Sequence, residues 1–173
     1  MSGEAQIAIW GKQPPAAGYL IYDAELFAEA FDQSVPALRP WLETPTIVIN
    51  KTLDSAITLR GATSSCDRCN PGDLLHLVFW WQVARPLRQD YKLFVHIADS
   101  TGRPLTQWDG LPGQNTQQTT KWPVGSAFEE HVLIRLPTDL PTGEYTVLVG
   151  LYDPNTGSRL GGEAIEVMQL SCD

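Results

Sequence analysis

From Thr46 onward, apolar and polar residues alternate along the chain with a period of two, the spacing typical of β-strands. The clearest run is 73–83, where every odd position from Leu75 to Val83 is apolar. Shorter runs around residues 47–49, 57–59, 91–97, 132–136, 145–151 and 165–167 repeat the alternation. About seven or eight strands in this order predict an all-β fold, an antiparallel two-sheet β-sandwich of the immunoglobulin-like or jelly-roll-like kind.

Turn-forming sequences separate these runs, and almost no helical spacing lies between them. The turns are Pro71-Gly72-Asp73, Ser100-Thr101-Gly102, Pro112-Gly113, Thr142-Gly143 and Pro154-Asn155-Thr156-Gly157. The last of these follows Asp153 and resembles a calcium loop at first sight. Because it lacks alternating acidic ligands, we expect a hairpin turn there instead.

Residues 1–45 differ in character from the sandwich region, 46–173, and we treat them as an N-terminal extension. Asp23 is a suitable helix N-cap, and an apolar stripe at helical spacing follows it. The prolines at 36 and 40 rule out a long helix beyond Gln33. One short amphipathic helix is therefore expected at about residues 23–32, with Leu26, Phe27, Ala30 and Phe31 on its apolar face.

The predicted outer faces of the strands are unusually apolar and aromatic. They carry His76, Val78 and Trp80 on one strand, Phe94 and His96 on the next, and Leu148 and Tyr152 on a third. Large exposed apolar patches are uncommon on monomers, which favours a covering role for the N-terminal helix. The alternative is an aromatic platform for a sugar ring.

Composition and charge narrow the class of protein. The chain has 173 residues, a net charge of −8 and 43% hydrophobic residues, so it is expected to fold rather than to be disordered. No basic run is present, which argues against nucleic acid and anionic lipid as partners. The longest apolar run is too short to span a membrane as a helix. Because no signal peptide begins the chain, we expect either a cytosolic protein or a soluble piece of a larger precursor.

The chain has three cysteines, Cys66, Cys69 and Cys172, an odd count that fits one disulfide plus a free thiol or three reduced thiols. The C-x-x-C of Cys66 and Cys69 is the motif most easily misread. A redox C-x-x-C normally opens a helix, whereas the segment 70–73 is a turn that leads into a strand. A structural zinc site needs four ligands, and no second ligand pair exists. We therefore expect a loop disulfide, either between Cys66 and Cys69 or between one of them and Cys172.

The sequence gives no positive support for catalysis, a cofactor or a metal. His76, His96 and His131 are scattered over three predicted strands without metal-ligand spacing. Glu129 and Glu130 are adjacent, so they point to opposite faces of a strand and make a poor glycosidase pair. No nucleophile elbow, phosphate-binding loop or dinucleotide glycine pattern is present.

One long stretch goes beyond generic patterning. It includes Ile57, Pro71-Gly72-Asp73, Phe79-Trp80-Trp81-Gln82, Tyr91-Lys92-Leu93-Phe94-Val95-His96-Ile97, Gln107-Trp108-Asp109, Pro112, Trp122, Leu136-Pro137, Gly143-Glu144-Tyr145, Gly150-Leu151-Tyr152-Asp153 and Arg159-Leu160. This pattern closely resembles the β-sandwich domain that follows the membrane-spanning part of many predicted bacterial glycosyltransferases of the protein-mannosyltransferase-like class. The resemblance covers about residues 57–168. It differs at Asn115 and Gln118, where the family usually has Gly and Pro, and the second difference removes a rigid kink from the loop.

The resemblance implies an extracytoplasmic domain, attached to or acting beside a lipid-linked sugar transferase, with no catalytic residues of its own. Carbohydrate, a glycosylation acceptor or the membrane glycosyltransferase are the partners it suggests. The residues we expect at a binding site are Trp108, Asp109 and Trp122 in the 103–125 loop, together with His96. In the alternative interpretation, the two tryptophans pin the loop to the sandwich and Asp109 caps its turn. Two other functions stay open: a structural or protein-interaction domain, and a glycan hydrolase.

Overall fold

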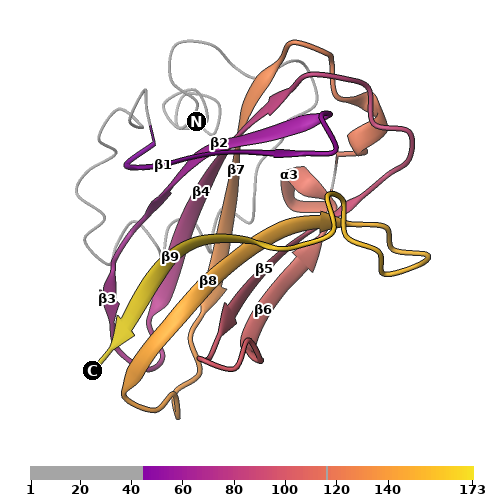
Figure 1. The fold of residues 1–173 in the computed structure, drawn as a ribbon. Helices are drawn as coiled ribbons and strands as arrows, with labels where there is room; N and C mark the ends of the chain where they lie inside the picture. The colour runs from indigo at the N-terminus through magenta and orange to yellow at the C-terminus, as the bar shows by residue number, and fades with distance from the viewer. Residues whose placement is uncertain (1–44, 116) are drawn as a thin grey trace, which may run out of the picture.

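The computed structural model describes residues 45–115 and 117–173, which form two β-sheets packed face to face (Figure 1). The first sheet has the strand order β1-β2-β4-β7, with bounds Ile47–Leu53, Ile57–Ser64, Leu74–Val83 and Ala127–Arg135. The second sheet has the order β3-β9-β8-β5-β6, with bounds Arg68–Cys69, Ile165–Cys172, Gly143–Tyr152, Lys92–Ala98 and Pro104–Gly110. The all-β two-sheet sandwich that the alternation predicts is confirmed for this part of the chain.

Neighbouring strands are antiparallel except for β3, a two-residue strand that runs parallel to the last strand, β9. The sequence pattern did not predict β3. Helical segments in the described ranges are short: α3 (Pro112–Asn115) and the 3-10 turn η1 (Thr119–Lys121). None of the described helices is long and apolar enough to cross a membrane. The helix expected at 23–32 lies outside the described residues, as does the extension up to residue 44.

The core forms between the inner faces of the two sheets, as period-two burial requires. On β4, each odd position from Leu75 to Val83 is at most 1% exposed. Their partners across the sheet come from β2 and β7, where for example Trp81 lies opposite Leu59 and Phe128. The second sheet contributes the corresponding residues Leu93, Val95, Ile97, Tyr145, Val147, Val149 and Leu151.

The long connection between β6 and β7 is fixed to the sandwich by specific contacts. The Gly113 N–H donates to a carboxylate oxygen of buried Glu130, at 2.7 Å. The hydroxyl of buried Thr119 donates to the Gln89 carbonyl and accepts the Tyr91 N–H. Gln118 has a φ of −82°, close to the value that proline would fix. The backbone at this position is therefore similar to the one expected with the proline of the resembled domain.

Candidate functional site

One candidate site lies on the outer face of the second sheet, where β8, β5 and β6 run side by side (Figure 1). Phe94 on β5 pairs with Asp109 on β6 and with Gly150 on β8. Directly paired residues project from the same side of a sheet, and the alternate positions on β5 face the core. We call the resulting surface the β5–β6–β8 face; its residues are Phe94, His96, Gln107, Asp109, Leu148 and Tyr152.

The centre of this face is an aromatic cluster built around Phe94. Gly150 is required beneath the ring, because a Cβ at that position would lie 2.6 Å from Phe94 Cζ. The rings of His96 and Tyr152 flank Phe94 at centroid separations of 4.7 and 6.1 Å. The Arg159 guanidinium lies 5.0 Å from the Phe94 ring centroid, a cation–π distance, and only 2% of Phe94 stays exposed. Phe94 therefore supports the cluster from below, while its neighbours form the accessible surface.

The polar groups of the face are partly buried, and Asp109 interacts with both His96 and Tyr152. His96 Nε2 lies 3.9 Å from Asp109 Oδ2, with 14% and 27% of the two side chains exposed. Burial lowers the pKa of His96; the Asp109 charge raises it and the Arg159 charge lowers it further. The imidazole is thus neutral near pH 7, with one nitrogen that donates and one that accepts. Burial and the nearby Asp109 also raise the pKa of the Tyr152 phenol, which keeps it protonated.

The structure brings together two of the four residues expected at a binding site and separates them from the other two. Trp108 pairs with inward-facing Val95, so it packs partly buried against the core, on the opposite side of β6 from Asp109. Trp122 is 6% exposed, and its ring centroid lies 4.3 Å from that of Phe128 inside the core. Trp122 thus anchors the β6–β7 connection, whereas Trp108 holds strand β6 itself against the core. Asp109 lies within β6 rather than capping a turn.

Arg159 was not among the expected site residues. It follows the hairpin turn after Tyr152 and forms an isolated antiparallel bridge with that residue. The turn itself is closed by hydrogen bonds from the Asn155 and Gly157 backbone N–H groups to Asp153. It is the hairpin turn that the sequence predicts. The sequence signal for Arg159 is its place just after the tight turn that ends β8, which returns the chain toward Tyr152.

Two histidines expected to be scattered instead meet on the outer face of the first sheet. His76 Nε2 lies 3.1 Å from His131 Nδ1, and His131 Nε2 lies 3.5 Å from Glu129 Oε2. The Trp80 indole N–H donates to the other oxygen of Glu129 at 3.2 Å. His76 and His131 are 3% and 0% exposed, and burial, with the neighbouring His131, lowers the pKa of His76 to about 3. Within the described residues, no group of histidines, cysteines and carboxylates is arranged to hold a metal ion.

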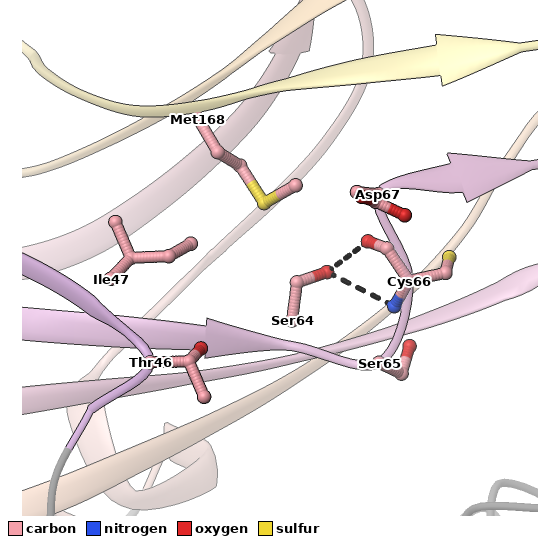
Figure 2. Close-up of a pocket in the computed structure, with 7 residues that line it drawn as sticks. All are labelled: Thr46, Ile47, Ser64, Ser65, Cys66, Asp67 and Met168. Carbon is pink, nitrogen blue, oxygen red and sulfur yellow. Dashed lines mark hydrogen bonds between the residues drawn. The ribbon is translucent and has the colours of Figure 1, made fainter.

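A pocket of about 350 Å³ opens at the edge of the sandwich, between β1, the end of β2 and β9 (Figure 2). Ile47 and Met168 form its apolar walls, and three hydroxyl groups line it. These hydroxyls are already engaged: Figure 2 shows Ser64 Oγ bonded to both the N–H and the carbonyl of Cys66. Ser65 Oγ accepts the His76 N–H, and Thr46 Oγ1 contacts Thr63. The pocket offers a sugar few free hydrogen-bonding groups, so the β5–β6–β8 face is the stronger candidate.

The structure pairs Cys66 with Cys69 in a disulfide next to this pocket. Cys172 is a buried free thiol in the last strand. Of the pairings that the sequence left open, this is the one within the 66–69 loop.

No family model matches this chain, and no curated protein matches it. Among solved structures, the chain is similar to the C-terminal domain of Wzt, with a TM-score of 0.51 and 10% identity over 75% of this chain and 81% of that one. It is also similar to the CARDB domain of the PF1109 protein from Pyrococcus furiosus, solved in complex with di-metal ions, with a TM-score of 0.41 and 15% identity over 72% and 95%. The likeness to the Wzt domain shows the fold: this chain is a two-sheet β-sandwich domain.

Proposed function

We propose that this chain is a non-catalytic module that binds carbohydrate on the β5–β6–β8 face and acts beside a membrane glycosyltransferase. The observation that carries the proposal is the arrangement of half-exposed His96, Asp109 and Tyr152 around the Phe94–Arg159 stack. The link to a transferase, and with it an extracytoplasmic location, rests on the sequence resemblance over about residues 57–168.

The chemistry of the face suits a sugar. The partly exposed ring of Tyr152 presents an apolar surface for the C–H patch of a pyranose and a hydroxyl at its edge. Asp109 accepts hydrogen bonds from sugar hydroxyls, while neutral His96 donates one and accepts one. These side chains project from paired strands rather than from loops, so the geometry is held before a ligand arrives.

The proposal assigns no bond-breaking step to this chain. Glycoside hydrolysis needs two carboxyl groups that converge within roughly 5–10 Å across the scissile bond. The adjacent carboxylates that might have served point apart: Glu129 contacts Trp80 and His131, whereas Glu130 accepts the Gly113 N–H. Any transfer chemistry then belongs to a membrane partner.

The proposal is tested by titrating the chain with soluble oligosaccharides selected on a glycan array, using isothermal calorimetry and NMR shift mapping. Asp109→Asn and Tyr152→Leu are each expected to weaken binding about tenfold, since each removes hydrogen bonds or stacking at the binding surface. Glu144→Gln is the matched control, because Glu144 is exposed on the same strand as Tyr152, eight residues away. Shifts confined to other surfaces, or equal losses in the control, would overturn the assignment of the face.

An array without any bound glycan would favour the structural alternative. In that case cross-linking to a membrane transferase, with no sugar affinity, is the expected positive result. Enzymatic activity of the chain alone on model glycosides would contradict both the carbohydrate-binding function and the structural alternative.

A further inference from the structure

All three cysteines of the chain meet where the short strand β3 lies against β9. Cys69 is the direct register partner of Cys172 in this parallel pair. Two backbone hydrogen bonds hold the pairing, from the Ser171 N–H to the Asp67 carbonyl and from the Asp173 N–H to the Cys69 carbonyl. Cys69 and Cys172 are 2% and 1% exposed and belong to the same core cluster, so both side chains enter the interior from adjacent backbones.

This register brings Cys172 within reach of Cys69. Neighbouring strands lie about 4.8 Å apart, and disulfides join residues whose Cα atoms are about 4.4–6.8 Å apart. The existing bridge between Cys66 and Cys69 spans 6.3 Å between Cα atoms, near the upper part of that range. Cys69 therefore has two cysteines at bonding range of its backbone, one in its own loop and one across the strand pair.

We propose that Cys69 exchanges between these two partners, which makes Cys66 a reactive thiol and a site for covalent modification. In the exchange, the Cys172 thiolate attacks the sulfur of Cys69, the Cys66–Cys69 bond breaks and a Cys69–Cys172 bond forms. Cys66 leaves as a thiolate and takes up the proton that Cys172 had lost. One disulfide and one thiol are present before and after, so the step needs no oxidant or reductant.

The two bridges differ in what they constrain. Cys66 and Cys69 are three positions apart, so their bridge closes a very short loop. A bridge from Cys69 to Cys172 closes a loop of about 100 residues and removes far more conformational freedom from the unfolded chain. It also fastens the last strand to the body of the sandwich. The exchanged form is therefore expected to resist unfolding more strongly than the form with the loop disulfide, which is the one formed in this structure.

The rate of the exchange depends on ionisation of Cys172. Burial raises the pKa of that thiol, and the charges of Asp173 and Asp73 raise it further. The phenol of Tyr145 on β8 faces the same region, and its own pKa is raised by burial and by Cys172. Because the thiolate is the attacking species, the exchange is slow at pH 6 and accelerates as the pH rises.

The released thiol differs from the one it replaces. Cys172 is fully buried, whereas Cys66 is half-buried in the loop between β2 and β3, beside the pocket of Figure 2. After exchange the free sulfur is therefore accessible to electrophiles and to small disulfides. Reaction with a small disulfide would fix the exchanged form by capping Cys66.

The test uses the chain as it stands, with its free thiol trapped by N-ethylmaleimide in denaturant after incubation at pH 6 and at pH 8.5. Trypsin cleaves after Arg60, Arg68 and Arg159, so each cysteine is placed on its own peptide and mass spectrometry assigns both label and bridge. We expect label on Cys172 at pH 6 and a growing fraction on Cys66 at pH 8.5. Label confined to Cys172 at both pH values, over hours, would overturn the proposal.

Two serine variants make the outcome independent of rate. Cys66→Ser, oxidised with a small disulfide, is expected to yield the Cys69–Cys172 bridge; two thiols left free or capped in the folded variant would contradict the proposed proximity. Cys172→Ser removes the attacking thiol and should keep the loop bridge at every pH. Label on Cys66 in that variant would show that the loop bridge opens without Cys172, which contradicts the mechanism. Circular dichroism establishes that each variant is folded before its result is used.

Discussion

The two outer faces of the sandwich each place a histidine beside a carboxylate, yet they differ in access to solvent. On the first sheet, His131 is 0% exposed and lies 3.5 Å from Glu129, with His76 and Trp80 continuing the chain of contacts. On the second sheet, His96 lies 3.9 Å from Asp109, and both side chains keep exposed area.

The same pair of residue types therefore has a different effect when it is buried than when it is partly exposed. In the buried group, each polar contact replaces water that burial has removed, so its main effect is on stability. In the half-exposed pair, water still competes, the direct interaction is weak, and both groups stay open to a ligand. The comparison therefore indicates a stabilising role for the first face and leaves the second face available for the recognition proposed above.

The largest contrast is expected from removing one histidine on each face. His76→Ala deletes a buried ring and its hydrogen bond with His131, which should lower the free energy of unfolding by about 3 kcal/mol. His96→Ala, at a half-exposed position, should lower it by less than about 1 kcal/mol while weakening sugar binding. Urea unfolding of both variants measures the two changes, and an equal loss of unfolding free energy would contradict the difference between the faces.

A pH series should separate the faces next. The pKa of His76 is about 3 in the folded chain, below the ordinary value of 6.5. The unfolded chain therefore takes up this proton first, so the contribution to stability is complete above pH 6.5 and is lost as the pH falls from 6.5 toward 3. Between pH 6.5 and 5 the loss is about 2 kcal/mol from this group. His76→Asn should show a shallower decline in urea unfolding over that interval; an unchanged slope would contradict the assignment.

Crowding the floor of the second face gives a smaller effect. Gly150→Ala places a Cβ against the Phe94 ring and forces it to move, at a cost of about 1–2 kcal/mol in unfolding free energy. Sugar affinity should fall with it, because the flanking rings rest on Phe94. Thr146→Ala, on the same strand and face, serves as the control. Thermal unfolding measures the stability of both variants, and calorimetric titration measures their sugar affinity. A stable variant that keeps full affinity would show that Phe94 is not a support.

The subtlest test concerns the charges around His96. Arg159 lowers the pKa of this imidazole and Asp109 raises it. Arg159→Ala should therefore shift the His96 titration to higher pH, and Asp109→Asn should shift it to lower pH. NMR titration of the imidazole resonances measures both shifts, and a change of the same sign in the two variants would contradict the geometry of the face.

Much of the fold follows from local alternation, whereas the site depends on pairing between distant strands. The core face of β4 could be predicted because Leu75 to Val83 alternate without a break. The segment 104–110 has a weak alternation, which predicts a loop instead of the observed strand β6. The inward direction of Trp108 follows only from its pairing with β5. The contact between His76 and His131 joins residues 55 positions apart through the β4–β7 register, which no local pattern encodes.

The position of the tryptophans has a practical consequence for spectroscopy. Of the four within residues 45–173, Trp81 and Trp122 lie in the core and Trp108 packs against it. Trp80 contacts Glu129 on the outer face of the first sheet, away from the β5–β6–β8 face. Indole emission from these four therefore reports loss of packing as the chain denatures, and it should change little when a ligand settles against Tyr152. A tyrosine or imidazole signal is the appropriate probe of occupancy.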